Sequence, residues 1–81
     1  MINELFEECK SIIVDRGADY GEAKESFERI ASYWSVYLGK ELTGGDVAML
    51  MVLFKITREQ SKHKHDNIVD AINYLALTKV L

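Results

Sequence analysis

Two cations and two carboxylates in the C-terminal half of the chain have the spacing of a polar site between two helices. Lys55 follows a run of eight apolar residues, where a solvated lysine would not be expected, and Arg58 comes one turn later. Asp66 and Asp70 are four residues apart, so on a helix they share one face. If the two helices fold back about residues 61–65, Lys55 lies near Asp70. Arg58 then lies near Asp66. The pattern predicts either a structural ion-pair network or a site for a charged ligand.

Polar and aromatic side chains nearby extend this predicted ligand site. Residues 62–65 read Lys-His-Lys-His and form a basic turn beside Arg58. This turn precedes a predicted helix N-terminus, which attracts phosphates. A metal site is disfavoured, because adjacent lysines repel a cation and a third ligand is lacking. We predict no catalytic residue and no metal ligand, and the predicted ligand-binding residues are Tyr20, Lys55, Arg58, His65, Asp66, Asn67, Asp70 and Tyr74.

The segment around Tyr20 has two interpretations. Gly17 and Gly21 let a backbone approach a ligand closely, while Asp19 and Tyr20 offer an acceptor and an aromatic face. The segment is also typical of a plain connection between two helices, with Tyr20 folded onto the core. The sequence alone favours this second interpretation.

The elements that position these residues are all predicted to be helices. The chain has no proline, and its five glycines fall between segments with helical apolar spacing. Gly17 and Gly39 are expected to end the first two helices, and Thr43 with Asp46 is typical of an N-cap. We expect helices at about 2–16 and 22–38, a third from the Thr43 cap to about residue 60, and a fourth with Asp66 as its N-cap or in its first turn, reaching residue 79. The fold class is therefore all-α, a compact bundle of about four helices or of three with a loosely attached first one, in one domain covering residues 1–81.

The third predicted helix has no polar face along its first half. Residues 47–54 are all apolar, and a helix that is apolar all round is expected to be buried all round. Three other helices of a chain this short can hardly surround it. We therefore expect self-association through residues 47–58, giving a homo-oligomer. The alternative is a short central helix shielded by its own chain.

Other apolar and aromatic residues have simpler interpretations. Trp34 lies on an apolar stripe and is expected in the core, whereas Tyr33 and Tyr37 flank that stripe and are expected to be exposed. Cys9 has no nearby base and is interpreted as a small core residue.

Composition limits the class of protein. The net charge is −3 over 81 residues, which argues against binding to duplex nucleic acid through a general basic field. A single cysteine cannot form an intramolecular disulfide, so a reducing cytoplasm is expected. The sequence has no signal peptide and no apolar run of ~18 residues, so we expect no membrane partner.

Several short motifs occur in a distinctive order between about residues 18 and 78. They are Asp19-Tyr20-Gly21, residues 26–31 with Trp34, Thr43, Asp46-Val47-Ala48, residues 55–58, residues 66–70 and Tyr74. In this order they resemble a family of small phage and prophage proteins known mainly as a domain of unknown function. The resemblance implies an all-α phage protein located in the cytoplasm of the infected bacterial host.

The chain is also distantly similar to the MazG-type nucleotide pyrophosphohydrolases, through its helical architecture and its acidic pairs. Those enzymes hold magnesium with an E-x-x-E pair and a later E-x-x-D pair. Glu25 and Glu28 have the first spacing, whereas Asp66 and Asp70 are four residues apart instead of three. Nearby cations would also partly neutralise the available carboxylates. This resemblance implies nucleotide recognition more directly than hydrolysis.

The function expected from the sequence is therefore binding without catalysis and without a cofactor. The ligand is expected to be a nucleotide or a cyclic nucleotide. The most specific version of this hypothesis is that the protein sequesters a host immune signal, which is an anti-defence role. One alternative is a reduced MazG-like pyrophosphohydrolase that uses magnesium. Another is a structural or interaction module in which the polar cluster only fixes helix register.

Overall fold

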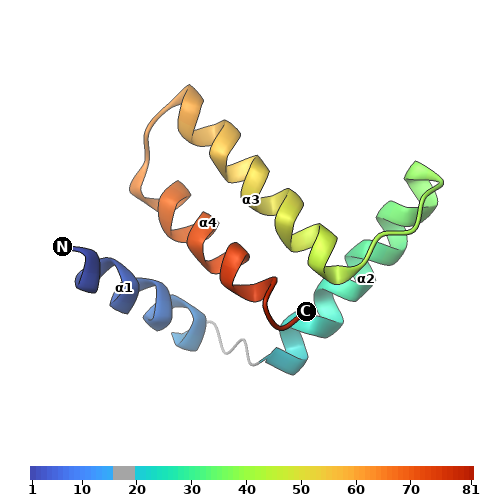
Figure 1. The fold of residues 1–81 in the computed structure, drawn as a ribbon, viewed down its shortest axis with the longest axis horizontal. Helices are drawn as coiled ribbons and strands as arrows, with labels where there is room; N and C mark the ends of the chain where they lie inside the picture. The colour runs from blue at the N-terminus through green and yellow to red at the C-terminus, as the bar shows by residue number, and fades with distance from the viewer. Residues whose placement is uncertain (16–19) are drawn as a thin grey trace.

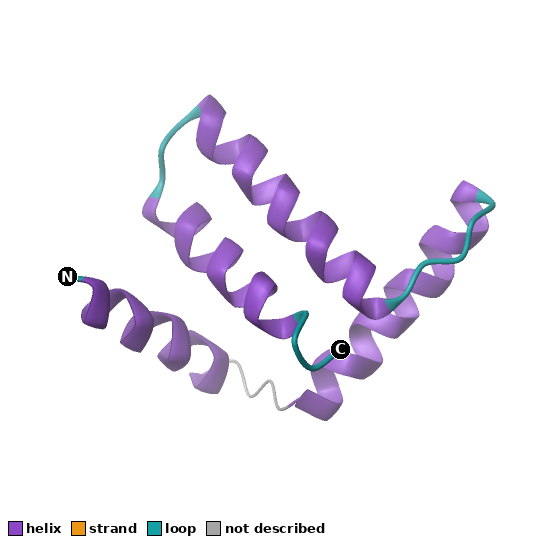
Figure 2. Cartoon of the chain, in the orientation of Figure 1, coloured by secondary structure: helices purple, strands orange, loops and turns teal. Residues whose placement is uncertain are grey.

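The computed structural model describes the backbone of residues 1–15 and 20–81, and the side chains of residues 1–12 and 22–81. It contains four helices in chain order (Figure 1). They are α1 (Ile2–Asp15), α2 (Tyr20–Leu38), α3 (Gly44–Ser61) and α4 (His65–Leu77). Helices and loops make up all of the chain that is described (Figure 2), which confirms the predicted all-α class.

The helices form an open arrangement and not the compact bundle that was expected, because among the described elements only α3 with α4, α2 with α3 and α1 with α4 are in contact. Helices α3 and α4 run antiparallel as a hairpin, and α1 packs on the side of α4 away from α3 (Figure 1). Helix α2 contacts α3 near the start of α3 and diverges from it, so that α2 and α3 form a V. The molecule is flat, with extents of 42 × 31 × 17 Å.

Local capping determines where α2 ends and α3 begins. Gly39 has a φ of +67°, and its N–H donates to the Ser35 carbonyl at 2.9 Å, which ends α2 as predicted. The Thr43 Oγ1 then accepts from the Asp46 N–H at 3.1 Å, and the Asp46 Oδ2 accepts from the Thr43 N–H at 2.9 Å. This reciprocal capping box confirms the predicted start of α3. The predicted cap at Gly17 lies outside the described residues.

Two predicted helix boundaries differ from the structure by two residues. Helix α2 begins at Tyr20 and not at residue 22, so the predicted ligand loop is partly helical. Helix α4 ends at Leu77 and not at residue 79. Helix α4 begins at His65 with Lys64 as its N-cap, where the Asn67 N–H bonds to the Lys64 carbonyl at 3.0 Å, and this start places Asp66 in the first turn, one of the two positions expected for it.

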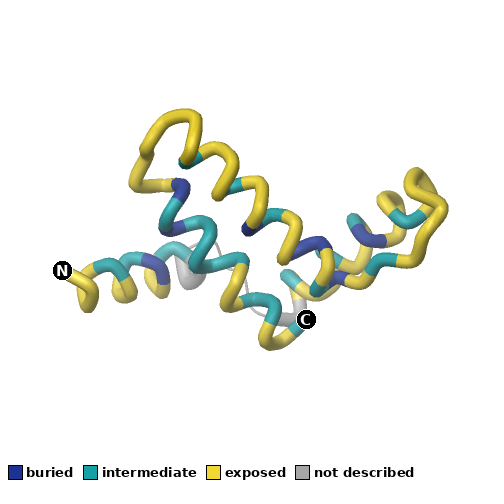
Figure 3. Tube along the Cα trace, turned by 45° about the horizontal axis from the view of Figure 1, so that its top comes forward, coloured by how far each residue is buried: buried dark blue, intermediate teal, exposed yellow. Residues whose placement is uncertain are grey.

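The buried residues lie where α4 packs between α1 and α3 and where α3 meets the middle of α2 (Figure 3). The buried apolar residues are Cys9, Ala31, Val47, Ala48, Val52 and Val69. The Cys9 thiol contacts the Val69 carbonyl at 3.9 Å, and burial raises the pKa of that thiol, which confirms Cys9 as a core residue.

The prediction that α3 is buried all round is wrong within one chain. Leu53 and Phe54, for example, are 52% and 47% exposed. Among the described elements only α2 and α4 contact α3, so its remaining side stays open. Trp34, predicted in the core, is 36% exposed, because it lies beyond Ala31, the buried residue on α2. Tyr33 and Tyr37 are exposed, as predicted.

Candidate functional site

The predicted proximity of Lys55 and Asp70 is confirmed. The Lys55 Nζ lies 3.0 Å from the Asp70 Oδ2, and the two side chains are only 16% and 22% exposed. Lys55 on α3 and Asp70 on α4 face each other because the two helices form the predicted antiparallel hairpin. The pair therefore links the hairpin through a largely desolvated ion pair.

The predicted pairing of Arg58 with Asp66 is wrong. Among the described side chains, no ion pair joins these two residues, and both are exposed. The Arg58 guanidinium lies instead over the Phe54 ring, 5.6 Å from its centroid, as a cation–π contact. Asp66 falls in the first turn of α4, where the helix dipole favours a carboxylate without any cationic partner.

Glu59, which the sequence reasoning missed, organises the turn between α3 and α4. Its Oε1 accepts from the Lys64 N–H at 3.0 Å and from the Asn67 Nδ2 at 3.3 Å, and its Oε2 contacts the His63 Nδ1. The bond with His63, followed by that from the Lys64 amide, lowers the pKa of Glu59. Asn67 is 4% exposed and also donates to the Lys62 carbonyl at 3.4 Å. The spacing of Glu59 and His63, four residues apart, was the available signal.

His65 faces α1 and not the α3–α4 turn. Its Nε2 lies 2.7 Å from the Glu8 Oε1, and this hydrogen bond, together with the charge of Glu8, raises the pKa of His65. The bond joins α1 to α4 across a surface hollow of about 480 Å³. That hollow is lined by Met1, Glu4, Leu5, Glu8, His65 and Ile68. Both histidines are thus paired with glutamates, so a ligand at the turn would meet the lysines and not the histidines.

A second hollow, of about 230 Å³, lies at the α3–α4 turn. It is lined by Thr57, Arg58, Ser61, Lys62, Lys64 and Asn67. Three of these side chains are cationic and none is a carboxylate. The N-cap of α4, Lys64, makes no side-chain capping bond, so the first amides of α4 add their partial positive charge. This hollow, called the basic turn below, has the chemistry of an anion site.

Tyr74, another predicted ligand residue, does not reach the basic turn. Tyr74 packs edge-on against Phe27 of α2, with ring centroids 6.2 Å apart. It follows His65 by nine residues, which corresponds to ~13 Å along a helix. The side chain of Tyr20 lies outside the described residues.

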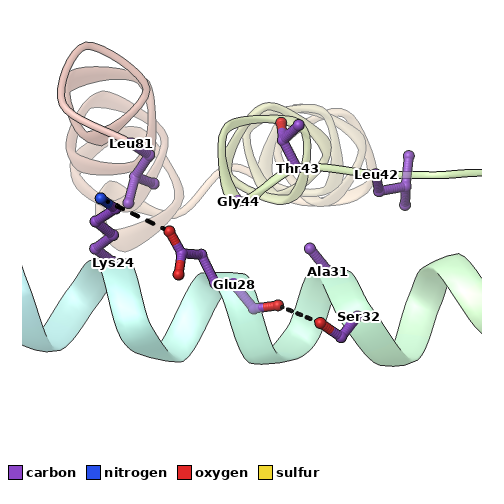
Figure 4. Close-up of a pocket in the computed structure, with 8 residues that line it drawn as sticks. All are labelled: Lys24, Glu28, Ala31, Ser32, Leu42, Thr43, Gly44 and Leu81. Carbon is purple, nitrogen blue, oxygen red and sulfur yellow. Dashed lines mark hydrogen bonds and ion pairs between the residues drawn. The ribbon is translucent and has the colours of Figure 1, made fainter.

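The carboxylates needed for a magnesium site also stay apart. Glu28 lies 3.9 Å from Lys24, and Glu25 lies 3.2 Å from Arg29, all on α2. Figure 4 shows Glu28 at a hollow of about 310 Å³ between α2 and the start of α3. Within the described part of the chain, no three His, Cys, Asp or Glu side chains are grouped to hold a metal ion.

Comparisons with known proteins identify relatives but no activity. The family described as a domain of unknown function, DUF6378, matches residues 4–81. The Gene 55 protein of Mycobacterium phage L5 is 48% identical over 61 residues, which cover 73% of this chain and 39% of the relative. The Gene 55 protein of Mycobacterium phage D29 is 38% identical over 76 residues, 91% of this chain and 50% of the relative. The chain thus spans half or less of each relative. No solved structure matches.

The relatives support the predicted phage resemblance, whereas the MazG similarity is not among the matches. None of the helices in the described residues is both long enough and apolar enough to cross a membrane.

Proposed function

The chain belongs to the DUF6378 family of phage proteins, and we propose that it binds a small phosphate-bearing ligand, a nucleotide or a nucleotide-derived signal, without catalysis. One observation carries this proposal. Arg58, Lys62 and Lys64 line a single hollow that contains no carboxylate and adjoins the uncapped N-terminus of α4.

Electrostatics favour a phosphate at the basic turn despite the net charge of −3. None of the three cations is ion-paired with another described residue, so a phosphate would not need to displace a carboxylate. Arginine binds phosphate through two parallel N–H donors, and lysine adds point charges. The Lys64 N–H already donates to Glu59 and the Asn67 N–H to the Lys64 carbonyl, so the three side-chain cations are the groups that would hold the phosphate.

The role of the Lys55–Asp70 pair changes in this proposal. Because the two groups satisfy each other and are largely buried, we assign them to holding α3 and α4 in register. Asn67 likewise holds the turn through Glu59. This assignment agrees in part with the structural-module alternative. Lys55, Asp70 and Asn67 stabilise the hairpin, and only the cations of the basic turn would contact the ligand.

The proposal also predicts what the ligand site selects. No aromatic side chain lines the basic turn, so phosphate charge should matter more than the identity of the base. Its most specific form is capture of a cyclic nucleotide immune signal of the host, because stoichiometric capture needs no catalytic group. The MazG-like alternative receives no support from the described residues, because its acidic pairs do not form one cluster.

The test compares arginine variants in nucleotide binding and turnover. Isothermal titration with ATP in the presence of a chelator should show saturable binding that weakens as salt is added. Arg58→Ala should weaken that binding about tenfold or more, as expected for loss of a charge-assisted contact worth about 1.5–3 kcal/mol. Arg29→Ala, an exposed arginine on α2, is the matched control and should bind as the parent does.

Two results would contradict the proposal. Equal binding by the Arg58→Ala variant and the parent would remove the basic turn as the site. Release of pyrophosphate from nucleoside triphosphates that depends on magnesium, resolved by chromatography, would favour the MazG-like enzyme instead.

A further inference from the structure

The single chain exposes more surface than a compact protein of its mass. Its accessible surface is 6086 Å². A compact monomer of 9.3 kDa is expected to expose about 5,000 Å², so the excess is roughly 1,100 Å². The radius of gyration is 13.4 Å, compared with about 12 Å expected for 81 residues. The isolated chain is therefore an open structure with surface left to cover.

Exposed large apolar residues gather on the C-terminal half of α2 and on α3, and those on α3 come from its central turns. Five large residues form an outer stripe, and they are Met49 (43% exposed), Leu50 (40%), Leu53 (52%), Phe54 (47%) and Ile56 (47%). At 100° per residue the first four lie on the side of the helix opposite Lys55, whose ammonium contacts Asp70 of α4. Ile56 lies at the edge of the stripe, where it lines a small hollow with Asn67 and Ile68 of α4. The outer stripe stays 40–52% exposed in the single chain, because α4 packs on the other side, α2 meets the start of α3 at Gly44, and α1 makes no contact with α3.

The outer stripe lacks the charges that would oppose burial. Lys55 is the only charged residue between Met49 and Ile56, and its ammonium is turned inward onto Asp70. Covering the stripe would therefore bury no unpaired charge, which is the usual penalty at an interface. Charges are also depleted from the cores of protein interfaces.

We propose that the outer stripe of α3 binds the same stripe of a second copy in a two-fold symmetric dimer. A two-fold axis brings one surface against itself, so an all-apolar stripe is its own complement. A stable dimer buries about 800 Å² per partner, so the outer stripe would form the apolar centre of an interface that also draws on neighbouring surface, and the excess of roughly 1,100 Å² over the whole chain is large enough for one such interface. Two helices crossing on such stripes pack their side chains as ridges into grooves.

The proposed dimer also bears on the basic turn, and this consequence rests on the proposed function. Phe54 belongs to the outer stripe, and its ring lies under the Arg58 guanidinium at 5.6 Å and near the Lys55 ammonium at 5.9 Å. Arg58 would then stand at the rim of the interface. Burial of the ring would strengthen its attraction for the cation and limit the positions that Arg58 can adopt.

The test measures the mass of the protein without ligand, so it is independent of nucleotide binding. Light scattering should give twice 9.3 kDa for the parent. Leu53→Glu, at 52% exposure on the outer stripe, should halve that mass while circular dichroism stays helical. Phe6→Glu, at 56% exposure on α1, is the matched control and should remain dimeric.

Each outcome decides the matter. A monomeric parent at high concentration would overturn the proposal and indicate that a different partner covers the stripe. A Leu53→Glu variant that stays dimeric would also overturn it, and so would an equal loss of mass in Phe6→Glu. If Leu53→Glu fails to fold, Leu53→Thr serves in its place, because it adds no charge. It should make the dimer dissociate at a higher concentration than the parent, and unchanged dissociation would refute the proposal.

Discussion

The Lys55–Asp70 pair allows the account of the α3–α4 hairpin to be tested by a double-mutant cycle. Removing one partner leaves a charge at a site where the side chains are only 16% and 22% exposed. Such a loss costs 3–5 kcal/mol when burial is complete and 0–1 kcal/mol when a pair is fully exposed. For this intermediate burial we expect about 2 kcal/mol for Lys55→Met or Asp70→Leu alone. In a domain of this size that lowers Tm by roughly 8–16 °C.

The double variant, with both apolar replacements, should recover to within about 1 kcal/mol of the parent, because no unpaired charge remains. Thermal unfolding followed by circular dichroism measures all four proteins, at one fixed concentration because a dimer's stability depends on it. The Glu25–Arg29 pair is the matched control. Its nitrogen and oxygen are 3.2 Å apart, but its side chains are more than 60% exposed, so its coupling should be only about 0.3–0.5 kcal/mol.

A coupling for Lys55 and Asp70 no larger than that of the exposed control would refute the claim that this pair fixes the hairpin. Titration of the double variant with ATP adds a second readout. Retained binding agrees with a structural role for the pair, whereas lost binding in a folded double variant would return both residues to the ligand site.

Two further predictions concern α1 and α3. Because Glu8 and, to a lesser extent, the charge of Asp66 raise the pKa of His65, its contribution to α1 docking is fully present below pH ~6.5 and is lost as pH rises through the folded-state pKa. The protection factors of α1 amides, which are hydrogen-exchange rates corrected for the intrinsic rise of exchange with pH, should therefore fall as pH rises above ~6.5, and His65→Gln should remove that pH dependence; protection factors with the same pH dependence in both proteins would contradict the link. Thr43→Ala should lower the free energy of unfolding by ~1 kcal/mol in urea titrations, since it removes the α3 capping box, and no change would contradict that role.

The sequence predicted those features that depend on local chemistry or on helical spacing. The Thr43–Asp46 cap and the left-handed Gly39 depend on neighbouring residues and are confirmed. The Lys55–Asp70 contact required only an antiparallel hairpin of known register, and it is confirmed as well. These features need no information about how distant elements pack.

The sequence did not predict features that depend on tertiary placement. The position of α1 decides that His65 pairs with Glu8, a contact across 57 residues of sequence. The divergence of α2 from α3 decides that Trp34 is 36% exposed, although its apolar spacing predicted the core. Arg58 contacts the Phe54 ring and not Asp66, because the ring lies one turn away on the same helix and competes for the cation with a carboxylate across the turn.

The central claim, that the basic turn binds phosphate, is tested most directly by nuclear magnetic resonance of the ¹⁵N-labelled protein titrated with ATP in the presence of a chelator. Amide shifts should move at Arg58, Lys62, Lys64 and His65, which line the hollow or begin α4. Amides around Glu25 and Glu28 on α2 should stay in place. Saturable shifts at the basic turn, lost in Arg58→Ala, are the predicted result. Shifts confined to α2, or none at saturating ATP, would contradict the claim.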